Sequence, residues 1–204
     1  MIIIAHRGYW MDASEKNTSL AFKRAFDNGF GVETDLRDSG SQIVISHDMP
    51  KGNELTFEAF MELLDGRNLP IALNIKADGL SGEVKCLLEK YGHANYFAFD
   101  MSIPEMVVYD RTGINFFASI SDVYKIFPSL KNISGIWLDG FYTDWYGKEE
   151  FDSYLKKGQK VCLVSPELHG REYMPVWKLC KNIYGMMICT DYPIEAREFF
   201  NVEN

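Results

Sequence analysis

The feature of this chain that most restricts its fold is a regular alternation of two kinds of segment. Short apolar and β-branched runs, typical of buried parallel strands, alternate with longer stretches whose apolar residues lie three and four positions apart, as on a helix. We expect strands over residues 2–5, 31–36, 71–75, 96–99, 115–120, 135–138, 160–164 and 184–189. We expect helices over residues 17–26, 56–64, 81–91, 103–110, 121–127, 148–157, 173–181 and 194–200.

This alternation predicts parallel strands joined by right-handed helical crossovers, which is an α/β fold. Eight repeats of the pattern favour a compact (β/α)8 TIM barrel that occupies residues 1–204 as one domain. The alternative is an open doubly wound sheet, but no glycine-rich phosphate loop follows the first strand. A further strand-like run over residues 42–46 predicts a short antiparallel excursion at the rim of the barrel.

Composition narrows the class of protein. The chain has 204 residues, of which 47% are apolar, and this is enough for one well-formed core. A net charge of -8 argues against a nucleic-acid partner. No stretch approaches the ~18 apolar residues of a membrane span, and the short apolar start does not resemble a secretion signal. The four cysteines are widely spaced, so we expect free buried thiols and a cytoplasmic location.

Polar residues follow several of the predicted strands at the point where each strand ends. His6 and Arg7 follow the first strand, and Glu33 and Asp35 lie near the end of the second. His47 and Asp48 follow the antiparallel excursion, and Asn74 and Lys76 lie at the end of the next strand. Because a (β/α)8 barrel builds its active site at the carboxyl ends of its strands, we expect these side chains to share one pocket.

These residue types point to acid–base chemistry around a cation and a phosphate. Glu33 and Asp35 are two positions apart on one strand and so face the same way, where they repel unless a cation such as Mg²⁺ or Ca²⁺ lies between them. The alternative is a solvated strand edge or a salt bridge to Arg37. The two imidazoles, His6 and His47, could exchange protons near neutral pH.

Two cations in this set are suited to a phosphate group. Arg7 carries a planar fork of donors that matches phosphate, and Lys76 could neutralise a phosphate oxygen. Each residue also has a simpler interpretation. His6 alone could be a structural hydrogen-bonding group, and Lys76 could be a solvated strand cap.

Taken as a set, these motifs resemble the glycerophosphodiester phosphodiesterase family, which belongs to the superfamily of phosphatidylinositol-specific phospholipases. The resemblance is most specific over residues 1–76 and returns at residues 190–193. Its motifs are His6-Arg7-Gly8, Asn17-Thr18, Glu33-x-Asp35, His47-Asp48, Asn74-Ile75-Lys76 and Thr190-Asp191-Tyr192-Pro193.

The resemblance implies a (β/α)8 barrel that hydrolyses a small phosphodiester to an alcohol and a phosphomonoester. It implies that His6 and His47 are the catalytic acid and base, and that Arg7 and Lys76 bind the phosphate. It also implies that Glu33, Asp35 and the residue at position 74 hold one divalent cation, Mg²⁺ or Ca²⁺.

Three departures from the family pattern bear on this interpretation. Asn74 stands where the family has a third carboxylate, so we expect weaker cation binding. Lys16 replaces an acidic residue, and the insertion that usually follows the His-Asp strand is largely missing. The substrate preference then differs from the family's, or a partner subunit of a homo-oligomer covers the pocket.

Two other functions are consistent with the sequence. One is a phosphate-ligand-binding barrel with weakened catalysis, and the other is a lyase-type relative that releases a cyclic phosphate. The aromatic segment 141–146 could stack on a sugar or lipid head group, or it could pack on a helix or a partner. We expect His169 to be a solvated loop residue and Asp191 to cap the last helix. The alternatives are that His169 contacts the substrate and that Asp191 has a role in the pocket.

Overall fold

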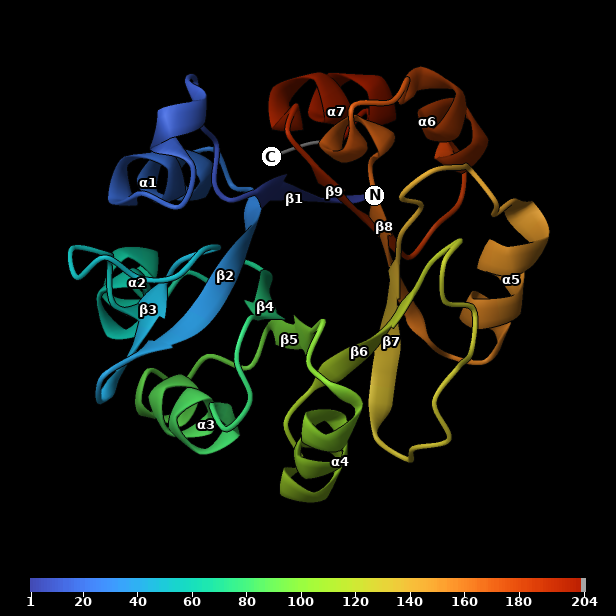
Figure 1. Cartoon of the computed structure of the whole chain (residues 1–204). Coiled ribbons are helices and arrows are strands. Elements are labelled where there is room, and N and C mark those ends of the chain that lie inside the picture. The colour runs from blue at the N-terminus through green and yellow to red at the C-terminus, as the bar shows by residue number, and fades with distance from the viewer. Residues whose placement is uncertain (203–204) are drawn as a thin grey trace.

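The apolar runs form eight parallel strands that close into a barrel (Figure 1). The structure is a computed structural model and describes residues 1–202. Neighbouring strands follow the order β1-β9-β8-β7-β6-β5-β4-β2, and β1 pairs with β2 to close the ring. The strands are β1 (Ile2–His6), β2 (Gly31–Ser39), β4 (Ile71–Ile75), β5 (Tyr96–Phe99), β6 (Phe116–Ile120), β7 (Ile133–Leu138), β8 (Lys160–Val164) and β9 (Met186–Thr190).

Seven helices surround the barrel, one fewer than the sequence predicts for the described residues (Figure 1). Three of them begin after a serine or threonine whose side chain accepts a backbone N–H of the first turn. A fourth begins after a glycine whose backbone N–H donates to a glutamate side chain of the first turn. The seven helices are α1 (Ser19–Asp27), α2 (Phe57–Leu64), α3 (Ser81–Lys90), α4 (Ile103–Thr112), α5 (Lys148–Lys156), α6 (Met174–Cys180) and α7 (Pro193–Phe200).

The predicted helix over residues 121–127 is wrong, because the chain between β6 and β7 forms a loop. The hydroxyl of Ser121 accepts the backbone N–H groups of Val123 and Tyr124, and the Ser121 N–H binds the Tyr124 carbonyl. The two bonds to the hydroxyl would also suit the start of a helix, but the bond from the Ser121 N–H to the Tyr124 carbonyl closes the segment into a turn instead. Pro128, directly after the segment, also disfavours a helical residue 127.

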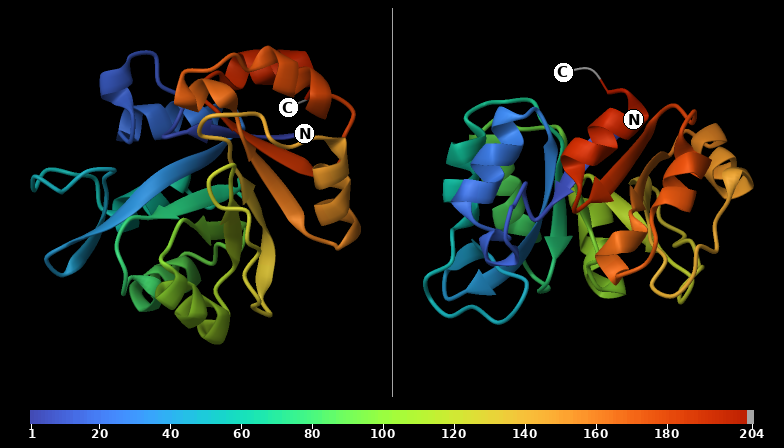
Figure 2. Two further views of the ribbon diagram at one scale, coloured as in Figure 1. Left: turned by 45° about the vertical axis from the view of Figure 1, so that its right-hand side comes forward. Right: turned by 90° about the horizontal axis from the view of Figure 1, so that it is seen from above.

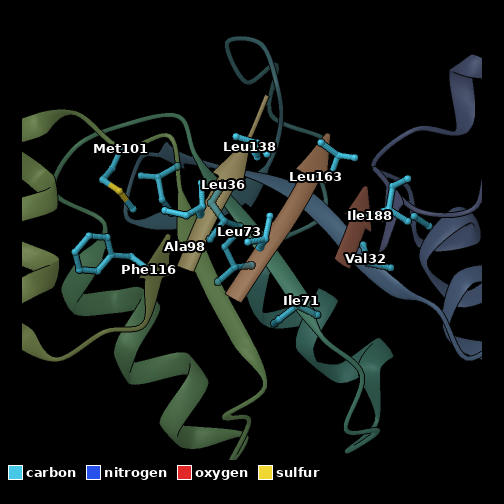
Figure 3. Close-up of a cluster of buried hydrophobic side chains, with 14 of the residues drawn as sticks. Val32, Leu36, Ile71, Leu73, Ala98, Met101, Phe116, Leu138, Leu163 and Ile188 are labelled. Carbon is cyan, nitrogen blue, oxygen red and sulfur yellow. The ribbon is translucent and has the colours of Figure 1, made fainter. Parts of the chain in front are cut away.

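Two apolar cores hold the fold together. The larger one lies between the barrel and the helices, and Figure 3 shows part of it, including Val32, Leu73 and Ile188. The smaller one fills the inside of the barrel and is built mainly from aromatic rings. Phe97 stacks on Phe117 and Phe99 stacks on Trp137, in each case with ring centroids 3.8 Å apart. The interior of the barrel below the carboxyl rim is therefore filled with side chains.

The predicted antiparallel excursion is confirmed. β2 continues past the barrel and turns at Gly40 into β3 (Gln42–Ile45), with Leu36 opposite Ile45 in the register. This hairpin projects away from the barrel (Figure 2). Only residues 46–56 separate β3 from α2, so the long insertion of the resembled family is largely missing, as expected.

Three of the four thiols are buried, at Cys162, Cys180 and Cys189, and all four are free. The prediction is wrong for Cys86, which lies on the solvent side of α3. No helix within residues 1–202 has the length and apolar character that crossing a membrane requires.

Candidate active site

Alternation along β2 places two carboxylates on the inside of the barrel and a threonine on the outside. Glu33 and Asp35 are buried, and Thr34 points into the layer of helices. There its hydroxyl donates a hydrogen bond to Asn17 Oδ1 at 2.9 Å. The side chain of Asn17 in turn donates to Asp35 Oδ2 at 2.8 Å, so both faces of the strand fix the position of this carboxylate.

His6 lies at the end of β1 and is paired with Asp191, the residue directly after β9. The Nδ1 atom of His6 is 2.6 Å from Asp191 Oδ1. Because a carboxylate only accepts hydrogen bonds, Nδ1 carries the proton and Nε2 is left as the accepting atom of the neutral ring. Nε2 lies 3.9 Å from Glu33 Oε2, which places the imidazole beside the inner carboxylates.

Burial and this pairing set the protonation of the two groups. Burial lowers the pKa of His6, and the hydrogen bond and charge of Asp191 offset that shift only in part. Burial raises the pKa of Asp191, but the contacts with His6 and Lys16 outweigh it, so the pKa lies below its ordinary value. His6 is therefore a largely neutral imidazole with a fixed tautomer near neutral pH.

Asp35 is the carboxylate around which the cations of the site gather. Arg7 Nε is 3.1 Å from Asp35 Oδ2, and Lys76 Nζ is 3.4 Å from Asp35 Oδ1. Asp35 is completely buried, whereas both cations are partly exposed toward the rim. The alternative of a salt bridge between this carboxylate pair and Arg37 is not observed, since Arg37 binds the His47 carbonyl and the Met49 sulfur.

Glu33 is buried without a cation in direct contact. Its Oε2 accepts the backbone N–H of Arg7 at 3.2 Å. Burial, together with the nearby charge of Asp35, raises the pKa of Glu33 to about 8. Without a further cation, Glu33 is protonated over much of the neutral range.

The backbone after β1 is bent tightly to bring these groups together. Arg7 and Gly8 both have positive φ, at 56° and 87°. A Cβ on Gly8 would lie 2.8 Å from atoms of Ala21 in α1, so this position requires glycine. The Asn17 N–H binds the Arg7 carbonyl at 3.0 Å and locks the loop against the start of α1.

His47 belongs to the rim but is placed differently from His6. Its side chain is 46% exposed, and its Nδ1 lies 2.9 Å from Asp48 Oδ1, which is itself 89% exposed. His47 lines a cavity of 620 Å³ together with Arg7, Lys16 and Asn17. Six of the predicted site residues therefore lie together at the end of the barrel, three of them buried and three partly exposed, and His47 lies on the wall of an open cavity that Arg7 also lines.

Asn74 lies on β4, directly opposite Asp35 in the parallel register, and is nearly buried. Neither Asn74 Oδ1 nor Asp35 Oδ1 has a hydrogen-bond partner. Asn74 Oδ1 is therefore without a partner, whereas Asp35 Oδ1 faces the Lys76 ammonium at 3.4 Å. Together with the Glu33 carboxyl group they are oxygen donors of the kind that Mg²⁺ and Ca²⁺ prefer. The residues at positions 33, 35 and 74 thus fit a hard divalent cation, although they include only two carboxylates.

Sequence reasoning was wrong about two residues at the rim. Asp191 makes no capping hydrogen bond to α7 and instead orients His6. His169 is only 24% exposed, and its Nε2 lies 2.8 Å from Asp139 Oδ1. Neither contact has a local sequence signal, since the partners are 185 and 30 positions apart.

Two further residues support the site and were not assigned a role from the sequence. Lys16 lies 3.4 Å from Asp191 Oδ2 and over the ring of Trp10. Glu167 accepts the backbone N–H of Asp191 at 3.2 Å and the hydroxyls of Thr190 and Ser165. These contacts hold the residue that orients His6.

The fold and its rim together define a (β/α)8 barrel with a charged site at the carboxyl ends of its strands. Within that class, a candidate glycerophosphodiester phosphodiesterase from Galdieria sulphuraria is similar, with a TM-score of 0.79 at 17% identity over 98% of both chains. A glycerophosphodiester phosphodiesterase from Agrobacterium tumefaciens has a TM-score of 0.75 at 19% identity, covering 99% of this chain and 100% of that one.

A third similar structure is a phosphodiesterase from Oleispira antarctica in complex with the product sn-glycerol-3-phosphate. Its TM-score is 0.72 at 15% identity, covering 99% of this chain and 97% of that one. No family model and no curated protein matches this chain. At these identities the three structures establish the fold, and the activity has to be argued from the site.

Proposed function

We propose that this protein is a phosphodiesterase that hydrolyses small glycerophosphodiester-like molecules to an alcohol and a phosphomonoester. The observation that carries the proposal is the His6–Asp191 pair beside Asp35 and its two cations, on a fold shared with glycerophosphodiester phosphodiesterases. An oriented imidazole next to cations is what phosphoryl transfer between oxygens needs.

The residues divide into two tasks. Arg7 and Lys76 extend from the buried Asp35 toward the rim, where they bind the phosphate and balance charge that develops on its oxygens. One of His6 and His47 removes a proton from the attacking hydroxyl or water as the new P–O bond forms. The other gives a proton to the alcohol oxygen as the old P–O bond breaks.

Asp191 gives His6 its defined role in this scheme. It holds the proton on Nδ1 and directs Nε2 into the site, and it stabilises the imidazolium that forms when Nε2 takes a proton. His47 has no buried partner, and its exposed position on the 620 Å³ cavity suits a residue that meets the substrate from the solvent side.

Glu33, Asp35 and Asn74 would hold one divalent cation, Mg²⁺ or Ca²⁺. Such a cation, when bound, polarises a phosphoryl oxygen as a Lewis acid. Because Asn74 contributes no negative charge, we expect affinity lower than a three-carboxylate site provides. The unpaired thiols fit a reducing compartment, so a cytoplasmic location remains a prediction.

The activity is tested by incubating the protein with glycerophosphocholine, glycerophosphoethanolamine, glycerophosphoinositol and bis(p-nitrophenyl) phosphate, each with Mg²⁺, Ca²⁺ or Mn²⁺. Phosphorus NMR identifies the product, and a cyclic phosphate would indicate a lyase. We expect His6→Asn to lower kcat by at least ~10²-fold, because general acid–base catalysis contributes that much. His93→Ala, on the opposite rim, is the matched control and should retain full rate. Absence of turnover with every diester would reject the proposal.

The metal assignment has its own test. Asn74→Glu adds a third carboxylate opposite Asp35, so calorimetric titration with Mg²⁺ or Ca²⁺ should show at least ~10-fold tighter binding. Asn74→Ala should bind more weakly than the wild type. Equal affinities in all three proteins would mean that residue 74 does not contact the cation.

A further inference from the structure

A second carboxylate–imidazole pair lies at the same rim, two strands away from the first. Asp139 follows β7 on the inward-facing line that includes Trp137, and it is nearly buried. Its Oδ1 is 2.8 Å from His169 Nε2 and also accepts the backbone N–H of Gly140 at 2.7 Å. The proposed reaction does not use this pair.

The two pairs are braced by one short segment, η2 (Pro166–His169), which follows β8. Glu167 of this segment binds the backbone of Asp191, and His169 binds Asp139. Since β8 lies between β7 and β9, this segment spans the rim between the two carboxylates. Asp139 follows β7 and Lys76 follows β4, three strands further around the ring of eight, so the second pair lies across the mouth from Lys76.

The imidazole of His169 presents one nitrogen to a ligand. Its Nε2 donates to Asp139, which leaves Nδ1 as an acceptor, and within residues 1–202 no hydrogen bond to Nδ1 is formed. The ring of Phe141 lies 4.9 Å from the imidazole, and Phe141 is 45% exposed. A hydrogen-bonding nitrogen beside an exposed aromatic face suits a hydroxyl-bearing carbon chain or ring.

The loop that carries Phe141 is held rigidly although it is exposed. Asp122 accepts the backbone N–H groups of Phe141, Tyr142 and Thr143, each at 2.9 Å. Trp145 donates to the Asp139 carbonyl at 2.7 Å, and Arg171 binds the Gly140 carbonyl. The aromatic face is thus preorganised beside His169, which lowers the entropy cost of binding a ligand there.

We propose that Asp139, His169 and Phe141 form a subsite for the alcohol part of the substrate that selects uncharged polyols over alcohols with no second hydroxyl. This proposal rests on the proposed function, because it takes the phosphate of the substrate to bind at Arg7 and Lys76. Asp139 orients the ring, His169 accepts a hydrogen bond from a hydroxyl of the polyol, and Phe141 packs against its carbon atoms. His169 and Phe141 are specificity residues, and Asp139 is a positioning residue.

Glycerophosphoinositol and glycerophosphocholine test this assignment, because they share the glycerophosphate group and differ in the alcohol. For His169→Ala we expect KM for glycerophosphoinositol to rise at least ~10-fold with kcat nearly unchanged, since one hydrogen bond to the bound polyol is lost. KM for glycerophosphocholine should change less than ~2-fold. Phe141→Ala should shift the two KM values in the same selective way. Equal effects on both diesters, or a loss of kcat alone, would overturn the proposal.

A second readout is independent of turnover. The chain has four histidines, so their imidazole NMR signals can be assigned from single variants. Both diesters should shift the His6 and His47 signals, whereas only glycerophosphoinositol should shift that of His169. A His169 response with no hydrolysis of any diester would reject the proposed activity and keep the subsite. An unmoved His169 signal in an active enzyme would reject the subsite alone.

Discussion

Asp35 illustrates how single residues carry this site. The carboxylate is fully buried, yet Arg7, Lys76 and Asn17 surround it with two positive charges and an amide donor. A buried charge is tolerated only when it is paired in this way. Its partners are thereby fixed at the rim, where their remaining donors face the substrate.

Glu33 is the contrasting case, because no cation contacts it directly. Its pKa of about 8 in the folded protein exceeds the value of 4.5 for the free side chain. Between these two pH values the unfolded chain releases a proton that the folded protein keeps, so stability falls as pH rises through this window.

We therefore expect Glu33→Gln to stabilise the protein at pH 8 by on the order of 3 kcal/mol. At pH 3 the variant and the wild type should be equally stable, because Glu33 is then protonated in both the folded and the unfolded state. Urea unfolding with a chelator present measures the difference, since a bound cation would lower the pKa of Glu33. A variant that is less stable at pH 8 would contradict this account of burial.

At this scale the sequence predicts residue types better than residue partners. The polar residues at the ends of β1, β2 and β4 were identified because strand ends are visible in the hydropathy pattern. The pairing of His6 with Asp191 was not, because it depends on the closure that brings β9 beside β1. The same holds for Asp139 and His169, whose contact depends on the path of a short loop.

At the scale of elements, the turn after β1 is the part of the fold that is least tolerant of substitution. Gly8 has a φ of +87° and its hydrogen atoms face the backbone of α1 at Ala21. The same turn presents Arg7 to Asp35, so a displacement of α1 would move the phosphate-binding cation.

Gly8→Ala should destabilise the protein by about 2–4 kcal/mol, because it adds both backbone strain and a steric overlap. Gly40→Ala is the matched control, since Gly40 also has a positive φ, at 62°, but has open space around it. It should cost only about 1 kcal/mol. Chemical denaturation measures both values, and equal losses would show that α1 can move to accommodate the methyl group.

The loop between β6 and β7 shows where an element was mispredicted. Val123, Tyr124, Ile126 and Phe127 have the spacing of an amphipathic helix, yet all four side chains are exposed. Periodicity records only where apolar residues stand in the chain. The competing turn at Ser121 is a local hydrogen-bonding choice that periodicity does not register.

At the scale of the whole molecule, stability depends on a barrel interior filled by stacked rings. Phe97, Phe99, Phe117 and Trp137 come from three neighbouring strands and contact one another. Strand count and alternation were sufficient to predict the closed barrel. The side chains that face the inside of the barrel were not predicted. A strand buried on both faces is apolar at nearly every position, so its sequence does not show which face points inward.

Trp137→Ala should cost about 3–5 kcal/mol of unfolding free energy, because it leaves a cavity that the surrounding rings cannot fill. The loss is measured by urea unfolding followed by circular dichroism. Tyr184→Ala, at a side chain that is 89% exposed, should change stability by less than about 0.5 kcal/mol. A small loss at Trp137 would indicate that the interior can collapse.

The order of the strands determines the point in folding at which the proposed active site becomes complete. β9 fills the gap between β8 and β1, and the residue that follows it supplies the carboxylate for His6. During translation, a nascent chain that has emerged only as far as β8 has an open sheet edge and an imidazole with no fixed tautomer. Closure of the ring and the fixed tautomer of His6 thus both depend on the docking of β9 between β8 and β1.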